Sequence, residues 1–208
     1  MTLHKIAQPE KIMFSGYRRL FWGILLMVFH ITLSWVRIFP EFIGCMVFVS
    51  GVGRFKSVAD SPNLRRAYIL ASTIAAIELF EFAAPMLIRS FSIPRHWSIL
   101  ITSAASGLMM LLIYDIFCAS SEMLRLNGNS LLADYLDKRL FVFVTIHTLL
   151  SIAMVLLIVV IESRLLAVTV LCVIPFRLWL AAVFAKLKRQ YGDAVPEAID
   201  VTEEITGE

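Results

Sequence analysis

Apolar residues along this chain are grouped in long blocks, and short polar segments separate the blocks. A helix needs about 20 mostly apolar residues to cross the roughly 30 Å hydrocarbon core of a bilayer. Five blocks meet or approach that length, and one more is shorter. The pattern predicts an all-α membrane protein with six transmembrane helices, at residues 20–36, 39–55, 67–88, 97–118, 140–161 and 165–187.

The short block at 39–55 decides the topology. Lys and Arg are enriched in the cytoplasmic loops of membrane proteins. If this block spans and the N-terminus is cytoplasmic, fourteen of the 19 Lys and Arg lie inside, four lie outside, and Arg177 lies within a helix. A five-helix alternative divides the same charges far more evenly. We therefore expect six spans in the plasma membrane, with both termini cytoplasmic.

Composition agrees with a membrane protein of one domain. The 208 residues are 59% hydrophobic and only 17% charged, whereas soluble domains are about a quarter charged. Residues 1–19 are expected to form a cytoplasmic segment, 20–189 the transmembrane domain, and 190–208 an acidic, disordered tail. No cluster of basic residues interleaved with aromatic residues indicates nucleic-acid binding.

The three cysteines are isolated and have no metal-ligand spacing, so no metal and no cofactor are expected. The segment 119–139 contains "NGN", a turn signal, between two stretches that could form short interfacial helices. This segment and the tail 190–208 are the surfaces where we expect a protein partner. The other expected partner is the lipid bilayer.

Ionisable side chains inside the predicted spans are costly, and they are the candidates for function. Glu78 and Arg177 lie roughly 16 and 18 Å along their helices from opposite sides, so their depths match. An ion pair between them is predicted, either as a structural clamp or as the polar centre of a substrate or ion pathway. Glu81, one turn from Glu78, either shares a proton with it or is solvated from outside.

Three further positions complete the candidate set. His147 is expected either in an interhelical hydrogen bond or in a proton relay. Asp115 is expected either to be solvated at the inner boundary or to line an inner vestibule. Arg37 and Glu41 are expected to lie together at an outer mouth, above the Glu81 end of the third helix.

Two stretches have small residues at a spacing of four, which is typical of close helix packing. One contains Ala71 and Ala75, and the other contains Ser103 and Gly107. No phosphate-binding loop, metalloprotease motif or nucleophile elbow is present, so we expect no enzyme. The sequence therefore favours a small transporter- or channel-like protein with a buried polar centre. The alternative is an accessory, assembly or sensory subunit whose buried charge pair is structural.

The segment "FPEFIGC" follows the first apolar block directly, with Phe39, Pro40 and Glu41 before Phe42–Cys45. It resembles an L-P-D-F-I-G-Y-like motif between the first two helices of small polytopic membrane proteins from Firmicute-type bacteria. Glu41 stands where the motif has Asp, and Cys45 where it has an aromatic residue. The resemblance implies a bacterial plasma-membrane protein and no particular activity.

Overall fold

Helices make up nearly all of the described chain, which confirms the predicted all-α fold. The computed structural model describes residues 9–28, 32–33, 36–37, 41–87, 95–160 and 163–192, with side chains at 11–28, 41–83, 101, 103–153 and 173–191. The helices are α1 (Pro9–Val28), α2 (Glu41–Lys56), α3 (Pro62–Leu87), α4 (Arg95–Leu126), α5 (Ser130–Val160) and α6 (Ser163–Gly192). Two short strands, β1 (Thr32–Leu33) and β2 (Val36–Arg37), form an antiparallel hairpin.

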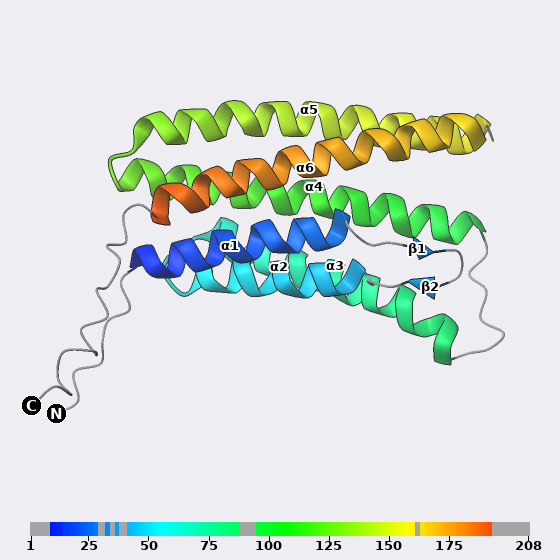
Figure 1. The fold of residues 1–208 in the computed structure, drawn as a ribbon, viewed down its shortest axis with the longest axis horizontal. Coiled ribbons are helices and arrows are strands. Elements are labelled where there is room, and N and C mark those ends of the chain that lie inside the picture. The colour runs from blue at the N-terminus through cyan, green and yellow to red at the C-terminus, as the bar shows by residue number, and fades with distance from the viewer. Residues whose placement is uncertain are drawn as a thin grey trace, which may run out of the picture.

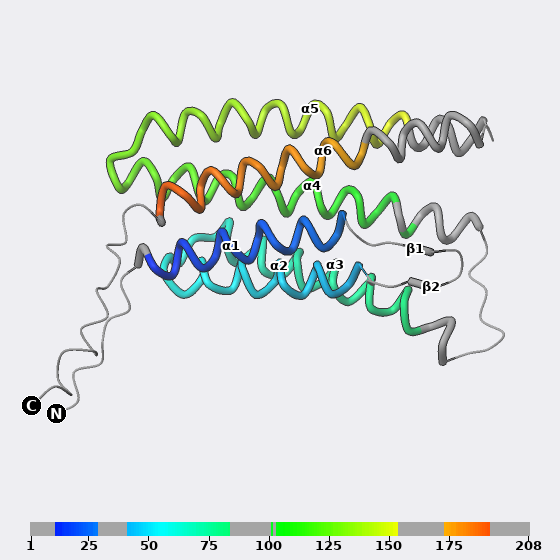
Figure 2. Tube along the Cα trace, viewed as in Figure 1, coloured from blue at the N-terminus to red at the C-terminus, as the bar shows by residue number. Residues whose placement is uncertain are grey.

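The six helices form a closed ring (Figure 1). Each helix packs against the next one along the chain, and α6 packs back against α1. Successive helices run in opposite directions, so their connections alternate between the two ends of the bundle (Figure 2). We call the end with the α2–α3 loop and the α4–α5 turn the inner end, and the end with the hairpin the outer end.

The first helix differs from its predicted span at both ends. It begins at Pro9 rather than residue 20, and it ends at Val28, before the hairpin. The early start follows from burial of Met13 and Tyr17. The Tyr17 ring packs 4.7 Å from the ring of Phe55 and 5.5 Å from the ring of Tyr191, centroid to centroid. The count of apolar residues missed the part of α1 before residue 20, because buried residues alternate there with charged ones.

The segment 119–139 is a helical hairpin rather than a loop with separate interfacial helices. α4 continues to Leu126, and α5 begins at Ser130. The predicted turn is confirmed, since Gly128 has φ of +77° and the amide of Asn129 donates to the carbonyl of Leu124 at 2.8 Å. The Asn129 side chain then caps α5 by accepting from the amide of Leu132 at 3.3 Å.

Glycines let α1 and α2 approach closely. Gly16 and Gly23 on α1, and Gly44 and Gly51 on α2, are each spaced by seven residues and all four are buried. A Cβ atom on Gly44 would lie 2.8 Å from the carbonyl oxygen of Gly23 and 2.9 Å from the amide nitrogen of Met27. Any side chain larger than hydrogen at this crossing would therefore push the two backbones apart.

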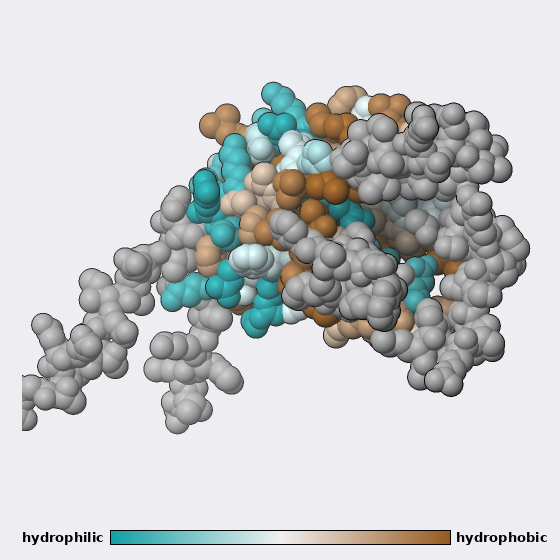
Figure 3. Space-filling view, turned by 45° about the vertical axis from the view of Figure 1, so that its right-hand side comes forward, coloured by the Kyte–Doolittle hydropathy of each residue, from teal (hydrophilic) through white to brown (hydrophobic). Residues whose placement is uncertain are grey.

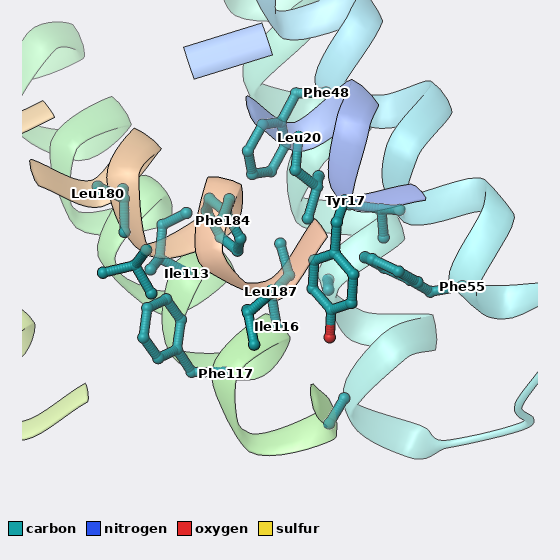
Figure 4. Packing of buried hydrophobic residues seen from close by; sticks show 14 of the residues in the cluster. Tyr17, Leu20, Phe48, Phe55, Ile113, Ile116, Phe117, Leu180, Phe184 and Leu187 are labelled. Atoms are coloured by element: carbon teal, nitrogen blue, oxygen red, sulfur yellow. The ribbon is translucent and has the colours of Figure 1, made fainter. Parts of the chain in front are cut away.

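Aromatic rings fill the interior of the ring of helices towards the inner end (Figure 4). The Phe184 ring, on α6, lies between the rings of Tyr17, Phe48 and Phe117, with centroid distances of 6.4, 6.5 and 5.8 Å. These partners come from α1, α2 and α4. Phe184 is fully buried, so the described residues of this part of the bundle form a packed core.

The two small-residue stretches have different outcomes. Ala71 is buried and Ala75 packs against the core, as the spacing predicted. Ser103 and Gly107 are exposed, and a Cβ atom on Gly107 would meet no other atom within 4 Å. Close packing at Ser103 and Gly107 within this chain is therefore wrong.

Within the described residues, one helical segment, Ser103–Leu126 in α4, is long and apolar enough to cross a bilayer on length and composition. The prediction of six membrane-spanning helices goes beyond this finding.

Substitution of Gly44 tests the close α1–α2 contact. We expect Gly44→Ala to destabilise the fold by about 1–3 kcal/mol, because the new methyl group overlaps backbone atoms of α1. Gly107→Ala is the matched control, since it adds the same methyl group to another helix where nothing is in contact. The control should be neutral or stabilising by up to about 1 kcal/mol. Thermal unfolding of the two purified variants measures both effects, and equal stability of the two would contradict the contact.

Candidate functional site

The guanidinium of Arg177 joins three helices. Its Nη1 donates to the Oε1 of Glu41 at 2.9 Å and to the backbone carbonyl of Met27 at 3.0 Å. Glu41 is the first residue of α2, and Met27 lies in the last turn of α1. The side chains of Arg177 and Glu41 are 32% and 23% exposed, so the pair is partly buried.

Two more groups lie close to this pair. Glu41, Glu78 and Arg177 are all near enough to the buried thiol of Cys45 to act on it electrostatically. Cys45 lies one turn after Glu41 on α2, and Glu78 comes from α3. We call Glu41, Cys45, Glu78 and Arg177 the polar centre. It brings α2, α3 and α6 together and includes the carbonyl end of α1.

The partner of Arg177 differs from the one predicted. The ion pair that Arg177 makes is with Glu41, and the predicted pair with Glu78 is corrected to this one. The position of a residue along its helix gives its depth in the bundle, but it does not show which neighbouring helix the side chain faces. The close α1–α2 crossing decides which carboxylate reaches Arg177, because it carries the first turn of α2 to the α6 side.

The predicted outer mouth is also changed. The described partner of Glu41 is Arg177, and its side chain is 23% exposed, so it is partly buried in this contact. The backbone of Arg37 lies in β2, opposite Thr32, while its side chain is outside the described residues. Phe39 and Pro40, from the motif-like segment, also lie outside the described residues.

His147 lies in an interhelical hydrogen bond, one of its two expected environments. Its Nε2 is 3.0 Å from the backbone carbonyl oxygen of Ser106 and 3.2 Å from the Ser106 hydroxyl, across the α4–α5 contact. The imidazole stacks on Phe143, with a centroid distance of 5.4 Å. Arg177 is close enough to act on the imidazole electrostatically, so His147 lies within electrostatic range of the polar centre.

Glu81 faces a different neighbour from Glu78. It borders a shallow groove of about 420 Å³ between α3 and α4, with Thr73, Phe80 and Ala104 among the lining residues. Three residues along a helix turn the side chain by about 60° from the starting direction, which is enough to change its neighbour. Among the residues that the structure describes, none from the polar centre lines this groove.

Asp115 forms a second charged contact, at the inner end. It is 1% exposed and accepts from Arg66 through both carboxylate oxygens, with Nε–Oδ2 at 2.6 Å. Both expected environments of Asp115, solvation and a vestibule lining, are therefore wrong. The ion pair also raises the pKa of Arg66 above its ordinary value. The sequence did not reveal this role of Arg66, because the residue lies just before an apolar block and looks like an ordinary charged residue of a loop.

Buried hydroxyl groups at the inner end were also missed. Tyr17 and Ser120 are almost fully buried, and neither hydroxyl has a hydrogen bond of good geometry among the described residues, although they face each other. Burial raises the pKa of Tyr17 far above its ordinary value, so its hydroxyl stays protonated at neutral pH. No group of three His, Cys, Asp or Glu that could hold a metal occurs in the described part of the chain.

The two residues of the Arg66–Asp115 ion pair differ in burial, so their substitutions should have unequal effects. We expect Arg66→Gln to lower folded yield more than Asp115→Asn, because the first leaves a buried carboxylate without its cation and the second leaves an exposed cation. Combining both substitutions should recover much of the yield that Arg66→Gln loses. Arg65→Gln, at an exposed arginine next in sequence with no described ion pair, is the control. Size-exclusion chromatography of the four variants and the wild type measures the yields, and an additive double variant would contradict the pairing.

Comparison with known proteins gives no relative: no family model, no curated protein and no solved structure matches this chain. We therefore infer its function from its own contacts.

Proposed function

We propose that the chain is a multi-pass protein of the plasma membrane, with six transmembrane helices and both termini cytoplasmic. Large apolar side chains that point outward from the middle of the helices support this. They are more than a third exposed, and they include Met46, Ile69, Leu79, Phe80, Leu111, Phe141, Leu149 and Ile152. A water-soluble monomer rarely exposes so much apolar surface. Figure 3 shows hydrophobic residues along the body of the bundle and hydrophilic ones gathered near its inner end.

Helix length also supports a membrane location. From residue 140 to its end at Val160, α5 contains no Asp, Glu, Lys or Arg, over about 31 Å of helix. Its charged residues lie in the turns before residue 140. α4 is likewise free of these residues from His96 to Tyr114. These lengths match the hydrocarbon core of a bilayer.

Within the membrane, we propose a non-enzymatic accessory, assembly or sensory subunit whose polar centre holds the bundle together. One observation carries this: a single nitrogen of Arg177 binds both Glu41 and the carbonyl of Met27. A guanidinium in hydrocarbon needs such partners. The aromatic core around Phe184 supports a closed bundle rather than a permeation path.

A small transporter is the second candidate. The Nε and Nη2 groups of Arg177 have no hydrogen bond among the described contacts, and the side chain is 32% exposed. Donors of this kind would suit an acidic or polar substrate. A transporter would have to move Phe184 and its neighbours to open towards the inner end.

Labelling tests the topology. With Cys45, Cys118 and Cys172 replaced by Ser, single cysteines are introduced at Asn127 in the α4–α5 turn and at Thr32 in the hairpin. We expect a membrane-impermeant maleimide to label Thr32→Cys in intact cells and Asn127→Cys only after the cells are opened. Both variants should stay in the membrane fraction after alkaline carbonate washing. Release of the protein by carbonate would refute the membrane location.

Charge removal tests the polar centre. We expect Arg177→Gln to cost about 2–3 kcal/mol of stability, less than for a fully buried pair, because it leaves Glu41 without its cation. Adding Glu41→Gln should recover most of that loss. The double variant Arg177→Gln/Glu78→Gln is the matched comparison and should recover less. Thermal unfolding in detergent measures the three variants against the wild type.

The same variants separate the two functions. For a structural centre, the stable Arg177→Gln/Glu41→Gln protein should keep the growth phenotype and partners of the wild type. For a transporter, it should be folded and inactive. A folded double variant with lost function would overturn the structural proposal.

A further inference from the structure

Two cations share one aromatic ring at the inner ends of α5 and α6. The Nζ of Lys186 lies 3.7 Å from the centroid of the Tyr135 ring, and the Cζ of Arg139 lies 5.0 Å from the same centroid. Arg139 also lies over Trp179, at 5.8 Å. We call Tyr135, Arg139, Trp179 and Lys186 the α5–α6 basic edge.

This arrangement differs from the other cation–aromatic contacts of the described residues. Lys56, Lys188 and Arg18 each lie over a ring that holds no second cation. The Nζ of Lys186 and the Cζ of Arg139 both lie within 5.0 Å of the Tyr135 centroid, so the two cations are close to each other. Like charges this close repel each other, and the repulsion grows where little water screens it.

No carboxylate among the described residues neutralises this pair. Neither Arg139 nor Lys186 has an ion pair there, and the nearest acidic residues along α5, Asp134 and Asp137, each contact Arg125 at 2.8 Å. Burial raises the pKa of Asp137, but hydrogen bonds from Ser121 and Arg125 outweigh this and hold it below its ordinary value, which fits a carboxylate already engaged by a cation. An anion from outside the chain would neutralise the charge of these two cations.

Apolar side chains continue from the basic edge along the same two helices. Ile146 on α5, seven residues after Arg139 and so on nearly the same face of the helix, is 37% exposed, and Leu178 on α6 is 40% exposed. Both lie towards the middle of the bundle from Arg139 and Lys186. An anionic head and an apolar body therefore have adjacent places, as a phospholipid requires and a free phosphate ion does not.

We propose that the α5–α6 basic edge binds the phosphate headgroup of an anionic phospholipid in the inner leaflet. The inference rests on the proposed membrane location. Arg139 and Lys186 supply the positive charge. Tyr135 holds both cations, and Trp179 holds Arg139, at the boundary between headgroups and hydrocarbon. Phosphatidylglycerol is the simplest lipid with this chemistry and serves as the probe.

Quenching of Trp179 by brominated lipids measures the binding. In a variant with Trp22, Trp35 and Trp97 changed to Phe, Trp179 is the remaining tryptophan. The protein is reconstituted in phosphatidylcholine bilayers that contain either brominated phosphatidylglycerol or brominated phosphatidylcholine. We expect stronger quenching by the phosphatidylglycerol. If the single-tryptophan protein does not fold, native mass spectrometry of the wild type measures retained phosphatidylglycerol against phosphatidylcholine.

A charge-matched pair of variants gives the control. Arg139→Gln/Lys186→Gln should lose the preference, by roughly fivefold for each cation removed. Arg54→Gln/Arg65→Gln removes two exposed cations at the same end, on α2 and α3, and should keep it. Equal loss in both double variants would mean general attraction to an anionic surface and would overturn the proposal.

The remaining outcomes separate other occupants and the membrane location itself. Equal quenching by both lipids in the wild type refutes the lipid site but leaves the protein in the membrane. Protection of Trp179 from brominated phosphatidylglycerol by inorganic phosphate alone would assign the edge to free phosphate. A preference that appears only after truncation at Gly192 would assign it to the acidic tail. Absence of quenching by either lipid would refute the membrane location.

Discussion

The close crossing of α1 and α2 determines where the charged groups of this protein meet. Gly44 approaches α1 so closely that a Cβ atom on it would overlap backbone atoms of Gly23 and Met27. Glu41 is one turn before Gly44, so the crossing fixes its carboxylate beside the last turn of α1. Arg177 then binds the carboxylate and the Met27 carbonyl with one nitrogen. A larger residue at position 44 would separate the two acceptors and leave Arg177 with one partner.

The same helix, α6, closes both halves of the bundle by different means. Near Arg177 it does so through charge, and near the inner end it does so through Phe184 and its aromatic neighbours. Burial of aromatic rings is insensitive to small rotations of a helix, whereas a hydrogen-bonded guanidinium is directional. The polar centre therefore specifies the register of α6, and the aromatic core supplies buried apolar contacts. A second ion pair, Arg66–Asp115, fixes α3 against α4 in the same directional way.

Sequence reasoning predicted the features that depend on local pattern. The six helices, their alternating direction and the turn at Gly128 follow from apolar blocks and turn residues. The predictions were wrong where a contact depends on which two helices are neighbours in the bundle. The depth of Glu78 matched that of Arg177, yet depth does not reveal the neighbour. The buried first turns of α1 were missed because Tyr17 is covered by Tyr191, 174 positions away, and not by any apolar run around it.

Positive charge is in excess at the inner ends of α5 and α6. Asp134 and Asp137 engage Arg125, and Asp115 engages Arg66, so these described acidic side chains are already satisfied within the chain. Arg139 and Lys186 are held on aromatic rings, which lower the cost of partial dehydration but do not cancel their charge. An excess of positive charge therefore stays at the place where α5 and α6 enter the proposed membrane. In a bilayer with anionic lipids, that excess favours the cytoplasmic orientation of this end and a bound headgroup at the same residues, through one electrostatic attraction.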